Sequence, residues 1–235
     1  MVAKATGYSI YNKEQKSRTQ INNLEELYPA LPNKKYDIIY LDPPWDYGGK
    51  MQFDKSSTSV DKLDFKKNIF ISSASFKYPT LKLKELKTLN INSISKNDSL
   101  IFMWTTNPHL QQAIELGCSW GYEYRTVAFI WNKMVHNPGK YTMSYCELCL
   151  LFKKGKIPTP RGARNVKQLV EIPRGKHSQK PNEIRDLIYK MFPTQQKIEL
   201  FSRVNSTGWD SWGNQIKKTK RQYWTRRSMS STSKR

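Results

Sequence analysis

The chain is poor in cysteine and in long apolar runs, and each shortage excludes a class of protein. Its three cysteines, Cys118, Cys146 and Cys149, are too few for a disulfide framework, which favours a reducing environment. No apolar stretch approaches the roughly 20 residues of a transmembrane helix, and the N-terminus lacks the apolar core of a signal peptide. We therefore expect an intracellular protein, cytoplasmic or nuclear, that is neither secreted nor embedded in a membrane.

Residues with metal-ligand spacing are scarce as well. Cys146 and Cys149 have the spacing of a zinc or redox pair, but they fall within residues 145–152, an apolar segment that predicts a strand. Positions three apart on a strand face opposite sides of the sheet, and no second cysteine pair is nearby. The three histidines show no ligand spacing. We expect no metal site. A glycine-rich G-x-G-x-x-G loop is also absent, which argues against a dinucleotide-dependent enzyme.

Acidic residues are outnumbered by basic ones. Lys and Arg total 40 against 19 Asp and Glu, which gives a formal charge of +21, and seven Trp and thirteen Tyr add flat surfaces for stacking. This combination favours a nucleic acid as the partner. On composition alone, a membrane surface or another polyanion stays open.

The length of 235 residues suits one folded domain with an appended tail. We place the domain at residues 1–215, with residues 1–35 partly extended. Residues 216–235 hold eight basic residues and no acidic one, which predicts a disordered tail that adds affinity through phosphate contacts. The cluster at 217–221 also fits a nuclear address.

Apolar segments and turn signals predict alternating strands and helices. Strands are expected at residues 36–41, 99–104, 124–131, 145–152 and 197–201, and helices at 82–89, 108–120 and 181–192. The last helix is the clearest, because Pro181 suits its first turn and Pro193 ends it. The pattern predicts an α/β fold, a mostly parallel sheet with helices on both faces. Polar stretches at 48–78, 133–144 and 153–174 are expected to be long loops that handle substrate.

The tetrapeptide Asp42-Pro43-Pro44-Trp45 is the most informative motif. It follows the apolar strand 36–41 directly, and the prolines end that strand because proline cannot donate to a ladder. Asp42 is therefore expected at the C-terminal tip of a strand, where open α/β sheets bind ligands. The alternative is a simple turn, since aspartate and proline are common turn residues.

These residue types suit methylation of an exocyclic amino group. The nitrogen lone pair of such a group is delocalised into the ring, and two hydrogen-bond acceptors can free it by drawing the nitrogen towards tetrahedral geometry. We assign these acceptor roles to the Asp42 carboxylate and the Pro43 carbonyl, with Pro44 keeping the backbone rigid. Trp45 and Tyr47 are expected to stack on the base. Aspartate is a weak base, so its first role is orientation and charge stabilisation.

Six blocks of sequence together carry a resemblance to a known family. They are Asp42 to Trp45, Phe102 to Thr106, Trp131 to Lys133, His177 to Pro181, Lys197 to Arg203 and Trp209 to Gln215. In this order they resemble the MT-A70 family of adenine-N6 methyltransferases, from about residue 36 to residue 215. The resemblance implies a Rossmann-like enzyme that uses S-adenosylmethionine, with the catalytic tetrapeptide before the main cofactor-binding strand.

The resemblance also implies roles for individual residues. The catalytic residues would be Asp42, Pro43, Pro44 and Trp45. The cofactor-binding residues would be Asp42, Lys180 and Arg203 near its carboxylate or ribose, Asn214 and Gln215 on the ribose, Asn205 after the arginine, and Asn22 near its adenine. Apart from the resemblance, we expect Tyr47 to stack on the target base, and Lys133 and His136, at the start of the polar stretch 133–144, to line its pocket.

We therefore expect methyl transfer from S-adenosylmethionine to N6 of adenine in a polynucleotide. DNA is favoured because the chain is compact and has no added RNA-binding module. The alternatives are RNA adenine-N6 methylation, a catalytically silent nucleic-acid-binding subunit, and N4-cytosine methylation, whose enzymes commonly begin the motif with serine. A monomer, a homodimer and a heterodimer with a related subunit are all compatible with the sequence.

Overall fold

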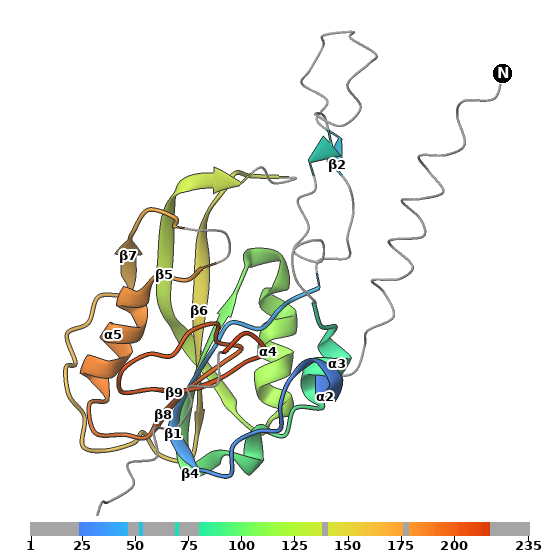
Figure 1. Cartoon of the computed structure of the whole chain (residues 1–235). Coiled ribbons are helices and arrows are strands. Elements are labelled where there is room, and N and C mark those ends of the chain that lie inside the picture. Colours follow the sequence, from blue (N-terminus) through green and yellow to red (C-terminus); the bar gives the residue numbers. More distant parts are fainter. Residues whose placement is uncertain are drawn as a thin grey trace, which may run out of the picture.

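A seven-stranded sheet forms the centre of the molecule. The computed structural model describes residues 24–46, 80–137, 141–175 and 179–216, together with the backbone of 52–53 and 69–70. The sheet has the order β7-β5-β6-β4-β1-β8-β9 (Figure 1). In chain order its strands are β1 (Tyr36–Leu41), β4 (Ser95–Thr105), β5 (Glu123–Asn137), β6 (Ser144–Lys154), β7 (Leu169–Glu171), β8 (Lys197–Leu200) and β9 (Asp210–Trp212). A separate antiparallel pair joins β2 (Gln52–Phe53) to β3 (Ile69–Phe70).

The sheet is mostly parallel, as the sequence predicts. Strands β4, β1, β8 and β9 run parallel to one another. In the described sheet only β6 runs against its neighbours, so β5 and β7, which pair in parallel, run in the common direction. The arrangement is Rossmann-like, and it brings the C-terminal ends of most strands to one edge.

Helices cover both faces of this sheet, which confirms the predicted layering. The helices are α2 (Leu24–Leu27), α3 (Leu83–Lys87), α4 (Leu110–Ser119) and α5 (Asn182–Met191), with 3-10 turns at Ile91–Ser93 and Asn107–His109. Figure 1 shows α5 on one side of the central strands and α3 and α4 on the other. Each of the three helices predicted from the sequence is present.

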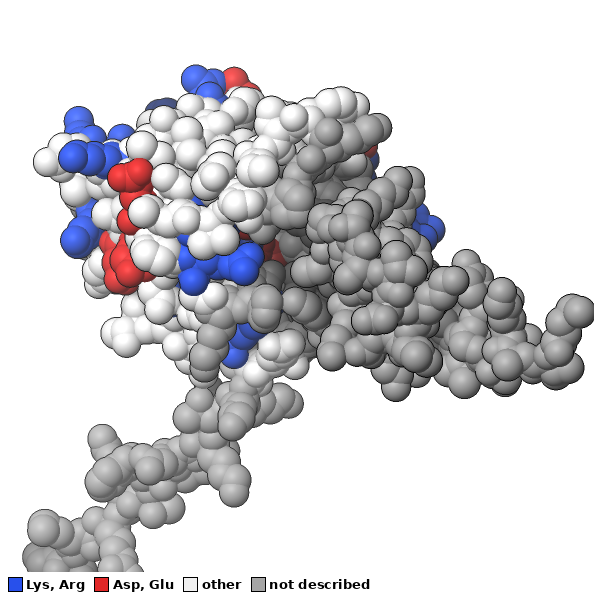
Figure 2. Space-filling model, turned by 90° about the horizontal axis from the view of Figure 1, so that it is seen from above, with Lys and Arg blue, Asp and Glu red and all other residues white. Residues whose placement is uncertain are grey.

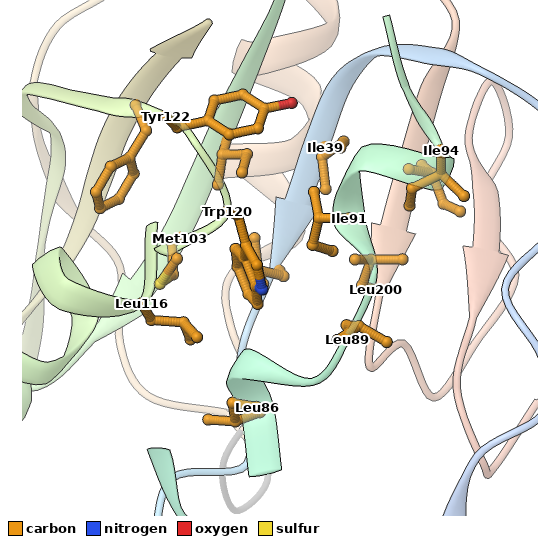
Figure 3. Packing of buried hydrophobic residues seen from close by; sticks show 14 of the residues in the cluster. Ile39, Leu86, Leu89, Ile91, Ile94, Met103, Leu116, Trp120, Tyr122 and Leu200 are labelled. Atoms are coloured by element: carbon orange, nitrogen blue, oxygen red, sulfur yellow. The ribbon is translucent and has the colours of Figure 1, made fainter. Parts of the chain in front are cut away.

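Strand β1 lies in the centre, and its side chains alternate between the two layers. Ile39 and Leu41 belong to a cluster that includes Leu86 of α3 and Leu116 of α4 (Figure 3). Ile38 and Tyr40 belong to a second cluster that includes residues of α5. Successive strand residues point to opposite faces, so an apolar β1 can be buried on both sides. The Asp42 motif thus follows a strand that is packed from both faces.

One loop prediction between these elements is wrong and another is incomplete. Residues 133–144 are not one long loop, because β5 continues to Asn137 and β6 begins at Ser144. Their polar composition indicated a loop, yet ladder pairing extends the hairpin beyond the core, where exposed strands need no apolar alternation. The stretch 153–174 contains β7, a strand of three residues that leaves no periodic signal. The stretch 48–78 lies outside the described residues, apart from the backbone of β2 and β3.

Candidate active site

The Asp42 motif lies at the C-terminal end of β1, as expected. Its backbone is tied down on both sides: the Pro43 carbonyl accepts the Trp45 amide at 2.8 Å, and the Pro44 carbonyl accepts the Leu81 amide at 2.8 Å. The Pro43 oxygen is thereby fixed in place, and a carbonyl oxygen has a second lone pair for another donor. Asp42 keeps 32% of its side chain exposed at this position.

Trp45 is an anchor and does not offer a free face to a base. Its residue is 4% exposed, and its indole nitrogen donates to the Trp104 carbonyl at 3.1 Å. Its ring also lies 5.7 Å from the ring of His109, centroid to centroid. The expectation that Trp45 stacks on the substrate base is therefore not supported. The side chain instead fastens the turn after β1 to the end of β4.

A partly open cavity lies beside the motif, at the C-terminal edge of the sheet. Its wall is formed by Tyr28, Asp42, Pro43, Pro44, Phe201, Arg203, Asn214 and Gln215. The fold thus brings the end of β1, the turn after β8 and the end of β9 to one place. Arg203, Asn214 and Gln215 lie 161 to 173 residues from Asp42 in the chain, and their convergence is what the sequence prediction of a cofactor site requires.

Two aromatic residues of this cavity were missed by the sequence analysis. Tyr28 stacks on Trp212 with a centroid distance of 5.1 Å and meets Phe201 edge to face at 5.2 Å. Phe201 has a positive φ of 58°, a left-handed conformation that a bulky residue rarely adopts. Such strain clusters at ligand sites. Tyr28 precedes the first predicted strand without any periodic signal, so the sequence could not place it here.

Four charged side chains form a network of ion pairs that begins at Asp42 and leads into the interior. The Lys180 ammonium lies 2.8 Å from one Asp42 oxygen and 3.2 Å from a Glu147 oxygen. The other Glu147 oxygen lies 3.3 Å from the Lys133 ammonium. Glu147 was missed by the sequence analysis, although it is the single acid within the apolar strand 145–152, and a buried charge needs a partner.

The pKa values reflect this pairing. Burial raises the pKa of Asp42 above its ordinary value, and Lys180 offsets part of the rise. Burial acts in the same direction on Glu147, but Lys180 and Lys133 outweigh it and hold the pKa of Glu147 below its ordinary value. Burial would lower the pKa of Lys180, yet Asp42 and Glu147 raise it. Lys180 therefore stays charged, and Asp42 is a better proton acceptor than an exposed aspartate.

The remaining predicted site residues lie in different surroundings. Lys180 bonds two protein carboxylates, so its expected contact with a cofactor carboxylate stays a prediction. Lys133 lies on β5 with a side chain only 3% exposed, so it does not line an open base pocket. His136 is exposed and packs against Tyr145, with ring centroids 5.6 Å apart. Asn205 is exposed and is not part of the cavity wall. Asn22 and Tyr47 lie outside the described residues.

Neither a metal-ligand cluster nor a membrane-spanning helix is found in the part of the chain that the structure describes. No group of three or more His, Cys, Asp or Glu side chains there is arranged to hold a metal ion. Within the same residues, no helix is both long and apolar enough to cross a membrane.

The fold and the site together define a class of enzyme. A mostly parallel seven-stranded sheet, with an acid at the tip of a central strand beside a cavity, is the architecture of a Rossmann-like methyltransferase. A family model described as MT-A70 matches residues 36–215, and the chain belongs to the MT-A70 family.

Relatives of very different length share this domain. The chain is 62% identical over 216 residues to the type II methyltransferase M.MunI of Mycoplasma sp., which covers 92% of this chain and 93% of that protein. It is 28% identical over 218 residues to the N(6)-adenine-specific methyltransferase METTL4 of Mus musculus, covering 84% of this chain and 41% of the relative. It is 27% identical over 192 residues to an Arabidopsis thaliana N(6)-adenosine-methyltransferase MT-A70-like protein, covering 77% and 24%. The chain thus spans less than half of the last two relatives.

Proposed function

We propose that this methyltransferase transfers the methyl group of S-adenosylmethionine to N6 of adenine in DNA. The observation that carries the proposal is the position of Asp42, which forms part of the same cavity wall as Arg203, Asn214 and Gln215. A target amino group held by Asp42 would therefore lie beside whatever occupies that cavity. This adjacency is what a direct methyl transfer requires.

The residues of the cavity fit S-adenosylmethionine. The planar amides of Asn214 and Gln215 can each bridge hydroxyl groups, which suits a ribose, and Arg203 provides a cation for a carboxylate. Tyr28 and Phe201 add aromatic surface to the wall. When bound, S-adenosylmethionine supplies a methyl group that is already activated by its sulfonium.

The chain's own contribution is to prepare the adenine nitrogen. Asp42 accepts one N–H of the amino group and the Pro43 carbonyl accepts the other, so the nitrogen lone pair is released from the ring and points towards the cavity. The Trp45 amide holds the Pro43 oxygen in place, and Lys180 holds the Asp42 carboxylate. The nitrogen carries an extra proton once it has gained the methyl group. Asp42, whose pKa is raised by burial, is positioned to receive that proton.

The comparison with relatives favours DNA over RNA. The match at 62% identity extends over nearly the full length of a protein named as a type II methyltransferase, a term used for DNA modification. Relatives named for adenosine match at 27%. The formal charge of +21 suits a polynucleotide in either case. In Figure 2 the described surface carries Lys and Arg side chains in several separate groups, which suits phosphate contacts at more than one point.

A labelling experiment tests the proposal. The protein is incubated with methyl-labelled S-adenosylmethionine and a panel of single- and double-stranded DNA and RNA, and the labelled nucleoside is identified. We expect N6-methyladenine in DNA, and its near loss in Asp42→Asn. Asp186→Asn, which changes an exposed acid on α5, is the matched control and should label as the wild type does.

The other outcomes each overturn one part of the proposal. Label confined to RNA would reassign the substrate, and label in N4-methylcytosine would reassign the base. A folded protein that transfers no label to any member of the panel would instead match a silent nucleic-acid-binding subunit. The intact Asp42 and its cavity argue against that reading.

A further inference from the structure

Lys133 lies at the inner end of the ion-pair network that runs from Asp42 through Lys180 and Glu147. Exposure of the side chains falls steadily from the cleft inward, from 32% for Asp42 to 15–16% for Lys180 and Glu147 and 3% for Lys133. A lysine so deeply buried is rare unless it is paired. Its ammonium lies 3.3 Å from Glu147, so it is placed to act on the site only through that carboxylate.

Lys133 lies on the buried face of β5, next to a distortion of the backbone. Met134 has a positive φ of 59°, its amide bonds the Asn132 side chain at 3.0 Å, and the register with β6 shifts after Asn132. The positive φ thus falls just after Lys133. Lys133 shares the buried face of Trp131, because residues two apart on a strand point to the same side, and Trp131 pairs directly with Glu147 across the sheet.

We propose that Lys133 is a positioning residue for methyl transfer, an inference that rests on the proposed function. By pairing with one oxygen of Glu147, Lys133 leaves the other oxygen for Lys180 and keeps the Lys180 ammonium at Asp42. Lys133 thereby keeps the Asp42 carboxylate charged and aimed at the cleft. It does this without touching the substrate or the cofactor.

The alternation of charges explains why the distant lysine matters. Two carboxylates and two ammonium groups alternate in this ion-pair network, so each Glu147 oxygen has its own cation. Without Lys133, the single Lys180 ammonium would serve both acids, and Glu147 would compete with Asp42 for it. The titratable and charged groups that face Asp42 are Lys180, Glu147 and Cys149 of β6, Glu199 of β8, and Arg203. Of these groups, Lys180 is the cation that would move from Asp42 towards Glu147 if Lys133 were lost.

The proposal predicts opposite effects for two substitutions. Lys133→Met should draw Lys180 towards Glu147 and shift the acid limb of the pH–activity profile to higher pH. A shift of one pH unit corresponds to about a tenfold lower rate on that limb. Glu147→Gln removes the competing anion, so the acid limb should shift to lower pH. Because the two signs differ, a general loss of stability cannot imitate both results.

Two further variants serve as controls. Lys133→Arg keeps the charge and should restore the position of the acid limb. Lys167→Met removes an exposed lysine and should leave the whole profile as in the wild type. In Lys133→Met the KM values for S-adenosylmethionine and for DNA should stay within about twofold of the wild type, because a positioning residue acts on kcat.

Carbon NMR gives a readout that does not depend on activity. The Asp42 carboxyl shift is followed against pH in the full chain and assigned by Asp42→Asn; Lys133→Met should raise its midpoint and Glu147→Gln should lower it. An unchanged midpoint in Lys133→Met overturns the inference even if the wild type methylates DNA. A raised KM with an unchanged acid limb also overturns it, because Lys133 would then contact a substrate. If the wild type proves inactive, the proposed function fails while the titration still tests the charge coupling.

Discussion

Gly213 lies so close to Ser202 that a β-carbon at position 213 would stand 2.0 Å from the Ser202 carbonyl oxygen. The Ser202 amide also donates to the Trp212 carbonyl at 2.9 Å, which holds the turn after β8 against the end of β9. Arg203 follows the first segment and Asn214 the second, and both line the cavity beside Asp42. The missing side chain of Gly213 therefore sets the spacing between two walls of the candidate cofactor site.

Replacing Gly213 with alanine should separate those walls. Overpacking against backbone costs about 1–3 kcal/mol, and we expect the dissociation constant for S-adenosylmethionine to rise about tenfold or more. Isothermal titration calorimetry measures this directly. Gly175→Ala is the matched control, because a β-carbon there would meet no atom within 4 Å. Cofactor affinity that is unchanged in Gly213→Ala would contradict the role assigned to this contact.

Asp42 should make the stability of the protein depend on pH in an unusual direction. Burial raises its pKa above the ordinary value of 3.8, so folding favours the protonated form. Its contribution to stability is full below the unfolded pKa and is lost as pH rises through the higher folded pKa. Relative to Asp42→Asn, the wild type should thus become less stable as pH increases above about 4.

Urea denaturation of the two proteins at a series of pH values tests this. We expect Asp42→Asn to be at least as stable as the wild type at pH 7 although it lacks methyl transfer. A wild type that gains stability relative to Asp42→Asn over the same pH range would show that the Lys180 ion pair outweighs the cost of burial.

Lys197 should contribute to the stability of α5 as a buried cap. It is 4% exposed, and its ammonium donates to the carbonyls of Phe192, Pro193 and Gln195 at 2.8, 3.2 and 2.6 Å. The last carbonyls of a helix have no partner within the helix, and a cation there also complements the helix dipole. Lys197→Met should lower the free energy of unfolding by about 2–4 kcal/mol, since several buried acceptors lose their donor.

Chemical denaturation at neutral pH measures the effect, and Lys87→Met is the control. Lys87 forms an exposed ion pair with Glu115, so its loss should cost less than about 1 kcal/mol. Equal costs for the two substitutions would show that the Lys197 contacts add nothing beyond a surface pair.

The sequence predicts the fold better than it predicts the charged network. Strand β1 matches its predicted bounds, because a short apolar run that is followed by two prolines predicts a buried strand and its end. Asp42, Arg203, Asn214 and Gln215 were named together on resemblance, and the topology brings them together.

Long-range pairing accounts for what was missed. Strand β9 has only three residues and is a strand because it pairs with β8, so no local sequence pattern predicts it. In the sequence, Glu147 is one polar residue in a strand that is predicted to be buried. Its ion pairs form only because the fold brings β5, β6 and the loop before α5 together. Lys133 was expected at the start of a substrate loop, because the polar residues after it conceal the continuation of β5, whose alternation places Lys133 on the buried face of Trp131.

The basic segment 216–235 should strengthen binding to DNA without taking part in the chemistry. It carries eight Lys and Arg residues, and each phosphate contact that is lost removes about 0.9 from the slope of log K against log salt concentration. Deleting the segment should therefore weaken DNA binding at low salt and flatten its salt dependence, while kcat at saturating DNA stays unchanged. Fluorescence anisotropy over a series of salt concentrations measures both effects. Replacing the same eight residues with glutamine should reproduce the deletion, because the charges and not the length of the segment carry the effect. A salt slope equal to that of the full chain would contradict this assignment.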